Sequence, residues 1–136
     1  LLALGADHVV NYRDNEKWGA EVYQLADGGV DHVLDVGGAA TIQQSIAAAR
    51  VGGHISLIGI LGGAKASILF PKLFFKQQRL TGLAVGSAEM QNALVKAIEA
   101  NGIKPVIDRE FDLSELGAAF EHQESGKHFG KIVVNI

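Results

Sequence analysis

Short apolar runs alternate with amphipathic segments along this sequence, and this alternation constrains its fold more than any other feature. Residues 30–36 and 54–60 are mostly apolar at successive positions, so a strand there would present apolar side chains to both faces of a sheet. Residues 18–26 and 42–49 repeat apolar side chains at helical spacing, and the second helix is expected to end at the glycine pair 52–53. This order predicts parallel strands joined by right-handed crossover helices, and hence the α/β class.

The rest of the sequence predicts elements of the same kinds at less regular intervals. Ser87 can cap a helix that ends near Gly102. Asp112, with Glu115 three residues later, has the pattern of a capping box before another helix. The other expected elements are an extended run at 9–12, a short helix from Pro71, and strands at 80–85, 106–111 and 131–136.

Composition excludes several classes of protein. The 136 residues are 48% apolar and 20% charged with a net charge of -3, which is enough for a core and unlike a disordered tail. The absence of cysteine excludes disulfides and thiolate metal sites within this chain. The 12 Lys and Arg residues, against 15 Asp and Glu, form no basic block, so no nucleic-acid partner is expected. The apolar runs are shorter than the roughly 20 residues that span a bilayer, so no membrane partner is expected either.

The first residues suggest where the chain comes from. Residues 1–5 include neither an initiator methionine nor the basic start of a signal peptide. We therefore expect a cytoplasmic protein, and a chain cut from a longer sequence.

Glycines mark the ends of three expected strands, where ligands bind in open parallel sheets. The three strand ends are Val36, Gly37 and Gly38; Ile58, Gly59 and Ile60; and Val85 and Gly86. Glycine lets a ligand approach the backbone closely, which favours a crevice that holds a cofactor. The same glycines are equally consistent with residues that only end strands and turn the chain.

The common catalytic and nucleotide motifs are missing. The chain contains no glycine fingerprint for dinucleotides, no phosphate-cradling Walker sequence and no nucleophile elbow. Residues 33–39 are similar to the first motif of methyltransferases, but further glycines and an acid after the next strand are lacking. His122 and His128 are six residues apart and do not share a helical face, so a structural or solvated role is favoured over zinc binding.

Taken in order, several segments resemble the C-terminal part of the medium-chain dehydrogenase/reductase family. This family includes the zinc-type alcohol dehydrogenases and their quinone oxidoreductase-like relatives. The matching segments are 4–13, 30–38, 52–59, 80–87, 118–120 and 126–134, which together cover essentially the whole chain. Each segment alone is weak, but the ordered set is specific.

The resemblance implies a truncated, doubly wound parallel Rossmann sheet that lacks its first two strands. Residues 1–103 would be a partial NAD(P)-binding domain, and residues 104–136 a strand-helix-strand segment that in the family returns to the catalytic domain. The run at 9–12 would then lack its partner strand, and the strand at 30–36 would be an exposed edge. An exposed edge promotes association, so the chain alone is expected to be oligomeric or domain-swapped.

The resemblance also implies NAD or NADP as the cofactor. Tyr12 would contact the adenosine, and Lys131 could approach the diphosphate. The remaining implied cofactor contacts lie at strand ends: Val36, Gly37, Ile58, Gly59, Ile60, Leu83 and Val85. The family's catalytic residues, zinc ligands and glycine fingerprint would all precede Leu1. No catalytic residue or metal ligand is therefore expected here, and the isolated chain should be inactive and bind the cofactor weakly or not at all.

The function expected from the resemblance is that of an NAD(P)-dependent oxidoreductase, of which this chain forms the C-terminal cofactor-binding portion. Such an enzyme transfers hydride between nicotinamide and an alcohol, aldehyde, ketone or quinone. A homodimer joined through the strand edge at 80–85 is expected. The alternative is a non-catalytic Rossmann-like fragment that acts as an association module.

Overall fold

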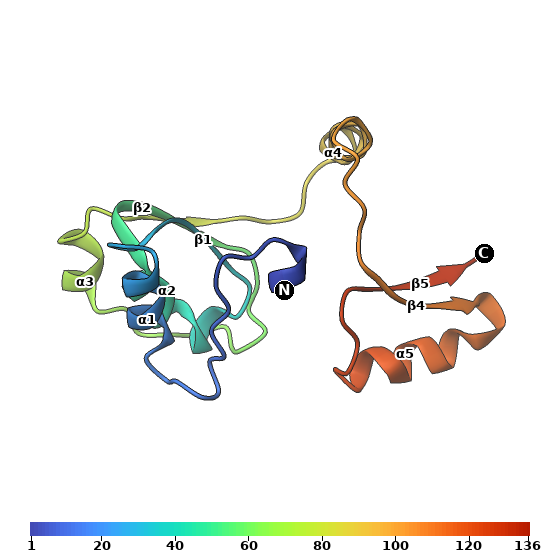
Figure 1. Cartoon of the computed structure of the whole chain (residues 1–136), viewed down its shortest axis with the longest axis horizontal. Helices are drawn as coiled ribbons and strands as arrows, with labels where there is room; N and C mark the ends of the chain where they lie inside the picture. The colour runs from blue at the N-terminus through green and yellow to red at the C-terminus, as the bar shows by residue number, and fades with distance from the viewer. The chain divides into compact units, whose positions relative to one another are not determined.

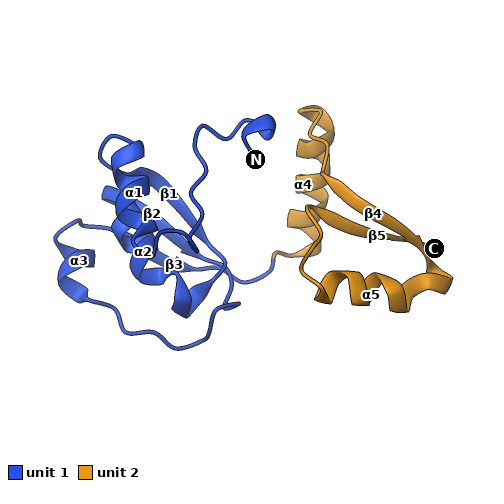
Figure 2. Cartoon of the chain, turned by 60° about the horizontal axis from the view of Figure 1, so that its bottom comes forward, with its two compact units in different colours: residues 1–85 blue, residues 86–136 orange.

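The computed structural model describes all 136 residues, which divide into two compact units, Leu1–Val85 and Gly86–Ile136 (Figure 1 and Figure 2). The division falls before helix α4 (Ala88–Ala100), whereas the boundary expected from the sequence, at 103, follows this helix. The assignment of residues 1–103 to a cofactor-binding domain stays a prediction. Each unit is described below by itself.

The first unit is built on a parallel sheet of three strands. The strands are β1 (Val30–Asp35), β2 (Ala49–Leu57) and β3 (Arg79–Gly82), and they lie side by side in that order. Both pairs of neighbouring strands are parallel, as the α/β pattern predicts. β1 is an edge strand, in agreement with the expected loss of its neighbour.

Helices α1 (Trp18–Leu25) and α2 (Ile42–Ala48) pack against each other, and α2 also lies against β1 and β2 (Figure 1). Ile42 and Ile46, one helical turn apart, point into the sheet and bury their side chains against Ile55 of β2. Burying each of these side chains contributes about 1.5–3 kcal/mol. The shorter helical segments of the unit are η1 (Leu2–Leu4), η2 (Gly38–Ala40) and α3 (Phe70–Phe74), the last with Pro71 in its first turn as predicted.

Only one face of the sheet is covered by helices of this unit. Val33, Ile55 and Leu80 are aligned across the three strands on the face that α2 covers. On the opposite face Leu34 is 71% exposed. The expected burial of β1 on both faces is therefore not met within the chain, because no helix of the unit packs over Leu34.

Several strand bounds differ from the expected ones, and β2 ends at Leu57 instead of at residue 60. Residues 9–12 form no ladder, which fits the absence of a partner strand. β2 begins at Ala49, so the glycine pair 52–53 lies within the strand, at a register irregularity opposite residues 30–32, and does not end α2. Gly52 has a φ of +73°, a left-handed conformation that glycine adopts readily. The ladder of β3 stops at Gly82 and does not continue to residue 85.

Two side chains from the segment before β3 cap the C-terminal end of α2. The Lys76 ammonium donates to the carbonyl oxygens of Ala47 and Ala49, each at 2.8 Å, and to that of Ile46 at 3.3 Å. Gln78 Nε2 also donates to Ile46 and Ala49. A cation at this end of a helix opposes the negative end of its dipole. Burial, and then the charge of Lys72, lowers the pKa of Lys76.

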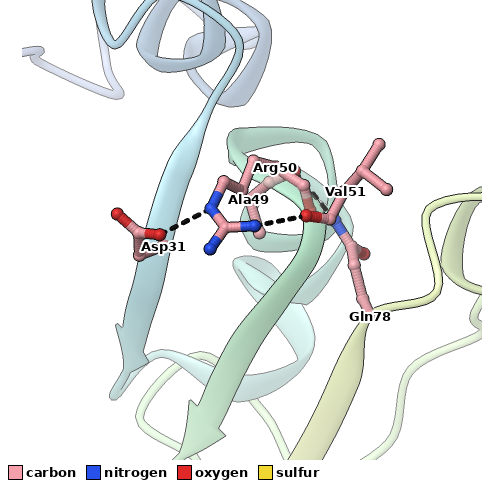
Figure 3. A network of polar contacts seen from close by, with 5 residues as sticks. All are labelled: Asp31, Ala49, Arg50, Val51 and Gln78. Carbon is pink, nitrogen blue, oxygen red and sulfur yellow. Dashed lines mark hydrogen bonds and ion pairs between the residues drawn. The ribbon is translucent and has the colours of Figure 1, made fainter.

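An exposed ion pair lies just beyond this end of α2, between β1 and β2 (Figure 3). Arg50 Nε lies 2.5 Å from Asp31 Oδ1 on the neighbouring strand, and Arg50 Nη1 donates to the carbonyl of Val51. The hydrogen bond from Arg50 lowers the pKa of Asp31. This pair joins the first residues of β1 and β2, where their register is irregular.

The second unit contains α4 followed by a parallel pair of strands, β4 (Ile107–Asp112) and β5 (Lys131–Asn135), with α5 (Leu116–Glu124) along one side of the pair (Figure 2). Two predicted caps are confirmed. The Met90 amide donates to Ser87 Oγ at 3.2 Å, and Asp112 and Glu115 form the capping box through η3 (Leu113–Glu115). α4, with 13 residues, is the longest helix of the chain. None of the helices combines the length and the hydrophobicity that a membrane span needs.

Candidate functional site

The carboxyl ends of β1 and β2 continue into two loops that lie against each other. The amide of Ile58 donates to the carbonyl oxygen of Asp35 at 2.8 Å, and the amide of Gly62 donates to that of Gly37 at 2.6 Å. β3 ends alongside them, since the amide of Leu83 donates to the carbonyl of Leu57 at 2.9 Å. We call residues 36–38 the β1 loop and residues 58–63 the β2 loop.

The two loops approach more closely than side chains would permit. A Cβ atom on Gly59 would lie 2.5 Å from the carbonyl oxygen of Val36. Gly38 has a φ of +71°, and a Cβ there would lie 2.9 Å from the Cα of Ile60. These glycines therefore have a structural function in this unit, because they let the two loops pack backbone to backbone.

The buried carboxylate of Asp35 lies where β1 joins its loop. Its Oδ1 accepts hydrogen bonds from the amides of Gly37 at 3.0 Å and Gly38 at 2.9 Å. The same oxygen accepts from the Thr41 hydroxyl at 2.6 Å, and Oδ2 accepts from the Ser45 hydroxyl at 2.6 Å. Asp35 is only 3% exposed, so these four donors take the place of water around its charge.

The donors determine the protonation state of Asp35. Burial alone would raise the pKa of this carboxyl group. The hydrogen bonds from Ser45, Thr41, Gly38 and Gly37 act in the opposite direction, and together they hold the pKa below its ordinary value. Asp35 is therefore an ionised acceptor at neutral pH and has no proton to donate.

Five of the predicted cofactor contacts are brought together by these loops. They are Val36, Gly37, Ile58, Gly59 and Ile60. The backbones of the two loops pack together, but the side chains of Val36, Ile58 and Ile60 are 52%, 47% and 62% exposed. An apolar surface at the carboxyl end of a parallel sheet is the usual place for a ligand of this fold class.

The other predicted contacts are not part of this group. Leu83 follows β3 beside Leu57, and Val85 is fully exposed at the end of the first unit. Tyr12 lies in the N-terminal segment, with its exposed ring 6.0 Å from the guanidinium carbon of Arg13. Lys131 begins β5 in the second unit, where its amide donates to the carbonyl of Val106. Their roles stay predictions.

The sequence analysis did not identify Asp35, Thr41 and Ser45 as members of a site. The signal for them was an acid that ends an apolar strand, followed by two glycines and by hydroxyl residues six and ten positions later. Thr41 and Ser45 are one helical turn apart, so both hydroxyls can face the same carboxylate.

Larger hollows lie elsewhere on the first unit. One of about 680 Å³ lies between the N-terminal segment and α1, including Trp18. Another of about 500 Å³ is lined by α1, α2, α3 and the segment that follows α3, including Tyr23 and Lys76. A smaller hollow of about 180 Å³ is lined by Gly38 and Ile60 of the two loops and by neighbouring residues, but not by Val36 or Ile58. We prefer the strand ends as the candidate site despite its smaller hollow, because ligands of open parallel sheets bind there.

The described side chains do not form a metal site. No group of three or more His, Cys, Asp or Glu residues is arranged to hold a metal ion. The closest pair, His122 and Asp108, is joined by a 2.7 Å contact between Nε2 and Oδ2. This bond, followed by one from the Phe129 amide, lowers the pKa of Asp108.

Comparisons with known proteins agree on one family. A family model described as zinc-binding dehydrogenase matches residues 4–134. A zinc-type alcohol dehydrogenase-like protein of Schizosaccharomyces pombe is 35% identical over 138 residues, which covers 98% of this chain and 40% of the relative. A solved structure from Sinorhizobium meliloti, assigned as an alcohol dehydrogenase, is 38% identical with a TM-score of 0.88 and covers 99% of this chain and 39% of its own. The structure of an NAD-dependent alcohol dehydrogenase is 29% identical, with a TM-score of 0.85 and coverages of 99% and 39%. The chain thus spans about two fifths of the length of these relatives.

Proposed function

We propose a function on the premise that this chain belongs to the zinc-binding dehydrogenase family. We infer that it supplies part of the NAD or NADP site of an oxidoreductase, which transfers hydride between the nicotinamide and an alcohol, aldehyde, ketone or quinone. The observation that carries the proposal is the apolar surface of Val36, Ile58 and Ile60 on two loops at the carboxyl ends of β1 and β2. The NAD dependence named for a relative that is 29% identical supports the choice of cofactor.

The residues present fit a nicotinamide cofactor. The side chains of Val36, Ile58 and Ile60 are apolar and exposed, so covering them with a bound ring or ribose would remove apolar surface from water. The glycines of both loops allow the close backbone packing that brings the two loops, and these side chains with them, together. In such enzymes the cofactor carries the hydride, and the protein binds it, orients it and excludes water.

The residues present do not fit zinc. The chain has no cysteine, and its histidines and acids form no group of three that could hold a metal. The paired His122 and Asp108 already satisfy each other. The proposed function of this chain therefore includes no step through a metal.

A pair of matched variants tests the proposal in the protein encoded by the complete open reading frame. Ile58→Asp places a charge at the proposed site, whereas Val51→Asp places one on an equally exposed apolar residue near the other end of β2; the two side chains are 47% and 55% exposed. Titration with NADH and NADPH should show about tenfold weaker binding for Ile58→Asp, equivalent to about 1.4 kcal/mol. Val51→Asp should bind like the wild type. Equal effects of the two variants, or no binding by the wild type, would contradict the proposal.

A second function, association, is favoured by a separate observation. β1 is an edge strand, and Leu34 is 71% exposed on the open face of the sheet. Exposed apolar edge strands pair readily with other chains. We therefore retain an association module as the alternative, with self-association of the chain as its test.

A further inference from the structure

One residue, Asp35, contacts both loops of the candidate site. Its carboxylate accepts from the amides of Gly37 and Gly38 in the β1 loop. Its backbone carbonyl accepts from the amides of Ile58 at 2.8 Å and Gly59 at 3.3 Å in the β2 loop. Every oxygen of Asp35 therefore accepts at least one hydrogen bond. Four of the donors are backbone amides of the two loops, those of Gly37, Gly38, Ile58 and Gly59.

The carboxylate also ties the β1 loop to a rigid element. Thr41 precedes α2 and Ser45 lies within it, and both donate to Asp35 at 2.6 Å. α2 is itself fixed by Ile42 and Ile46, which are among the most buried side chains of the unit. The β1 loop is thus held to the core through Asp35.

The β2 loop is then attached to the β1 loop and its continuation. Gly62 donates to the carbonyl of Gly37 at 2.6 Å, and the carbonyl of Gly63 accepts from Ala39 at 3.0 Å. A displacement of the β1 loop would therefore be passed to the residues that carry Ile58 and Ile60. Because substrate and cofactor sites lose function when their supports loosen by even 1 Å, this connection has a functional consequence.

We propose that Asp35 is a positioning residue, which holds the β1 and β2 loops in the arrangement that receives the cofactor. This inference rests on the proposed function, and it assigns Asp35 no contact with the cofactor. Asp35 acts as an acceptor of four hydrogen bonds, so the neutral isostere Asn, which keeps one oxygen, should retain part of its effect.

The variants Asp35→Ala, Asp35→Asn and Ser45→Ala test the proposal in the protein encoded by the complete open reading frame. Leu73→Ala is the matched control, because it loosens the core from α3 without changing α2 or a contact to either loop. Two quantities are measured below the unfolding transition: hydrogen exchange of peptides that cover residues 36–40 and 58–63, and affinity for NADH and NADPH.

Asp35→Ala should accelerate exchange in both peptides and weaken cofactor binding, each by about tenfold, the size of effect expected from one strong hydrogen-bonded anchor. Asp35→Asn and Ser45→Ala should show smaller losses, and Leu73→Ala should show neither despite a lower melting temperature. If Asp35→Ala does not fold, the two milder variants still decide the question.

Three results would be decisive against parts of this interpretation. Unchanged exchange in the two peptides would overturn the positioning role. Faster hydrogen exchange in the two loops with unchanged cofactor affinity would show that Asp35 stabilises the loops without affecting cofactor binding. A wild-type protein that binds neither cofactor would refute the proposed function instead, while the exchange data would still show whether Asp35 holds the loops.

Discussion

The hydroxyl of Ser45 donates a 2.6 Å hydrogen bond to Oδ2 of Asp35, and both residues are almost fully buried. No lysine or arginine pairs with this carboxylate, so its charge is stabilised by hydroxyl and amide donors alone. Such a charge tolerates burial only while its donors are in place, because an unpaired buried carboxylate is costly. The relationship joins the end of β1 to α2 and supports the first two predictions below.

Removal of the Ser45 hydroxyl should destabilise the first unit. Ser45→Ala leaves Oδ2 of Asp35 without a partner, and we expect a loss of about 1–3 kcal/mol in the free energy of unfolding. Chemical denaturation measures this loss. Ser67→Ala is the control, because the Ser67 side chain is exposed and makes no hydrogen bond; an equal loss in both variants would contradict the prediction.

Acid should remove the contribution of Asp35 to stability. The pKa of Asp35 is lowered in the folded state, so the unfolded chain binds its proton first and stability falls as the pH drops. The contribution is complete above about pH 4 and is lost as the pH falls through the folded pKa. Denaturation midpoints of wild type and Asp35→Asn should therefore differ at pH 7 and converge toward acid. A difference that stays constant with pH would show that ionisation of Asp35 does not contribute.

The closeness of the two loops can be tested with a single methyl group. Gly59→Ala would place a Cβ 2.5 Å from the carbonyl oxygen of Val36, so the loops must separate, at a cost of about 1–3 kcal/mol. The control is Gly82→Ala, since no atom lies within 4 Å of a Cβ at Gly82. Thermal unfolding should show a lower melting temperature only for Gly59→Ala. Equal melting temperatures for the two variants would mean that the loops lie farther apart.

The hydrogen bonds of Lys76 to the end of α2 predict that Lys76 contributes to stability and that Lys72 does not. Lys76→Met keeps the aliphatic chain but removes the donors to three carbonyl oxygens, and we expect a loss of about 2 kcal/mol. Lys72→Met, on an exposed side chain without these bonds, should change stability little. Urea denaturation distinguishes the two, and similar midpoints for both variants would argue against the cap.

The exposed edge strand predicts self-association of the isolated 136-residue chain. Sedimentation should show dimers or larger species, and Leu34→Lys on β1 should shift them toward monomer, because a charge on an edge strand opposes pairing. Leu61→Lys, a change at a loop residue that is 90% exposed, should not. A well-folded wild-type monomer would refute the prediction.

Local features of the fold could be predicted from the sequence because they depend on residues within about one helical turn of each other. Ile42 and Ile46 marked the buried face of α2 by their spacing, and both caps, at Ser87 and at Asp112 with Glu115, were recognisable from side chains three residues from their partners. The glycines at 37–38 and 59 likewise marked where the first two strands give way to loops, but not that these loops pack against each other.

The sequence by itself thus determined the order of strands and helices, their parallel arrangement and the family resemblance. Tertiary structure decided which groups satisfy one another. The Asp35 carboxylate accepts a hydrogen bond from Ser45, ten residues away. Lys76, in the segment before β3, donates to carbonyl oxygens at the end of α2. Tertiary structure also placed Gly52 at a register irregularity, because such an irregularity exists only relative to the strand that pairs with it. The spacing of apolar residues indicates which side of a helix or strand is apolar. A donor and its acceptor from distant parts of the sequence are matched only when folding brings those segments into contact.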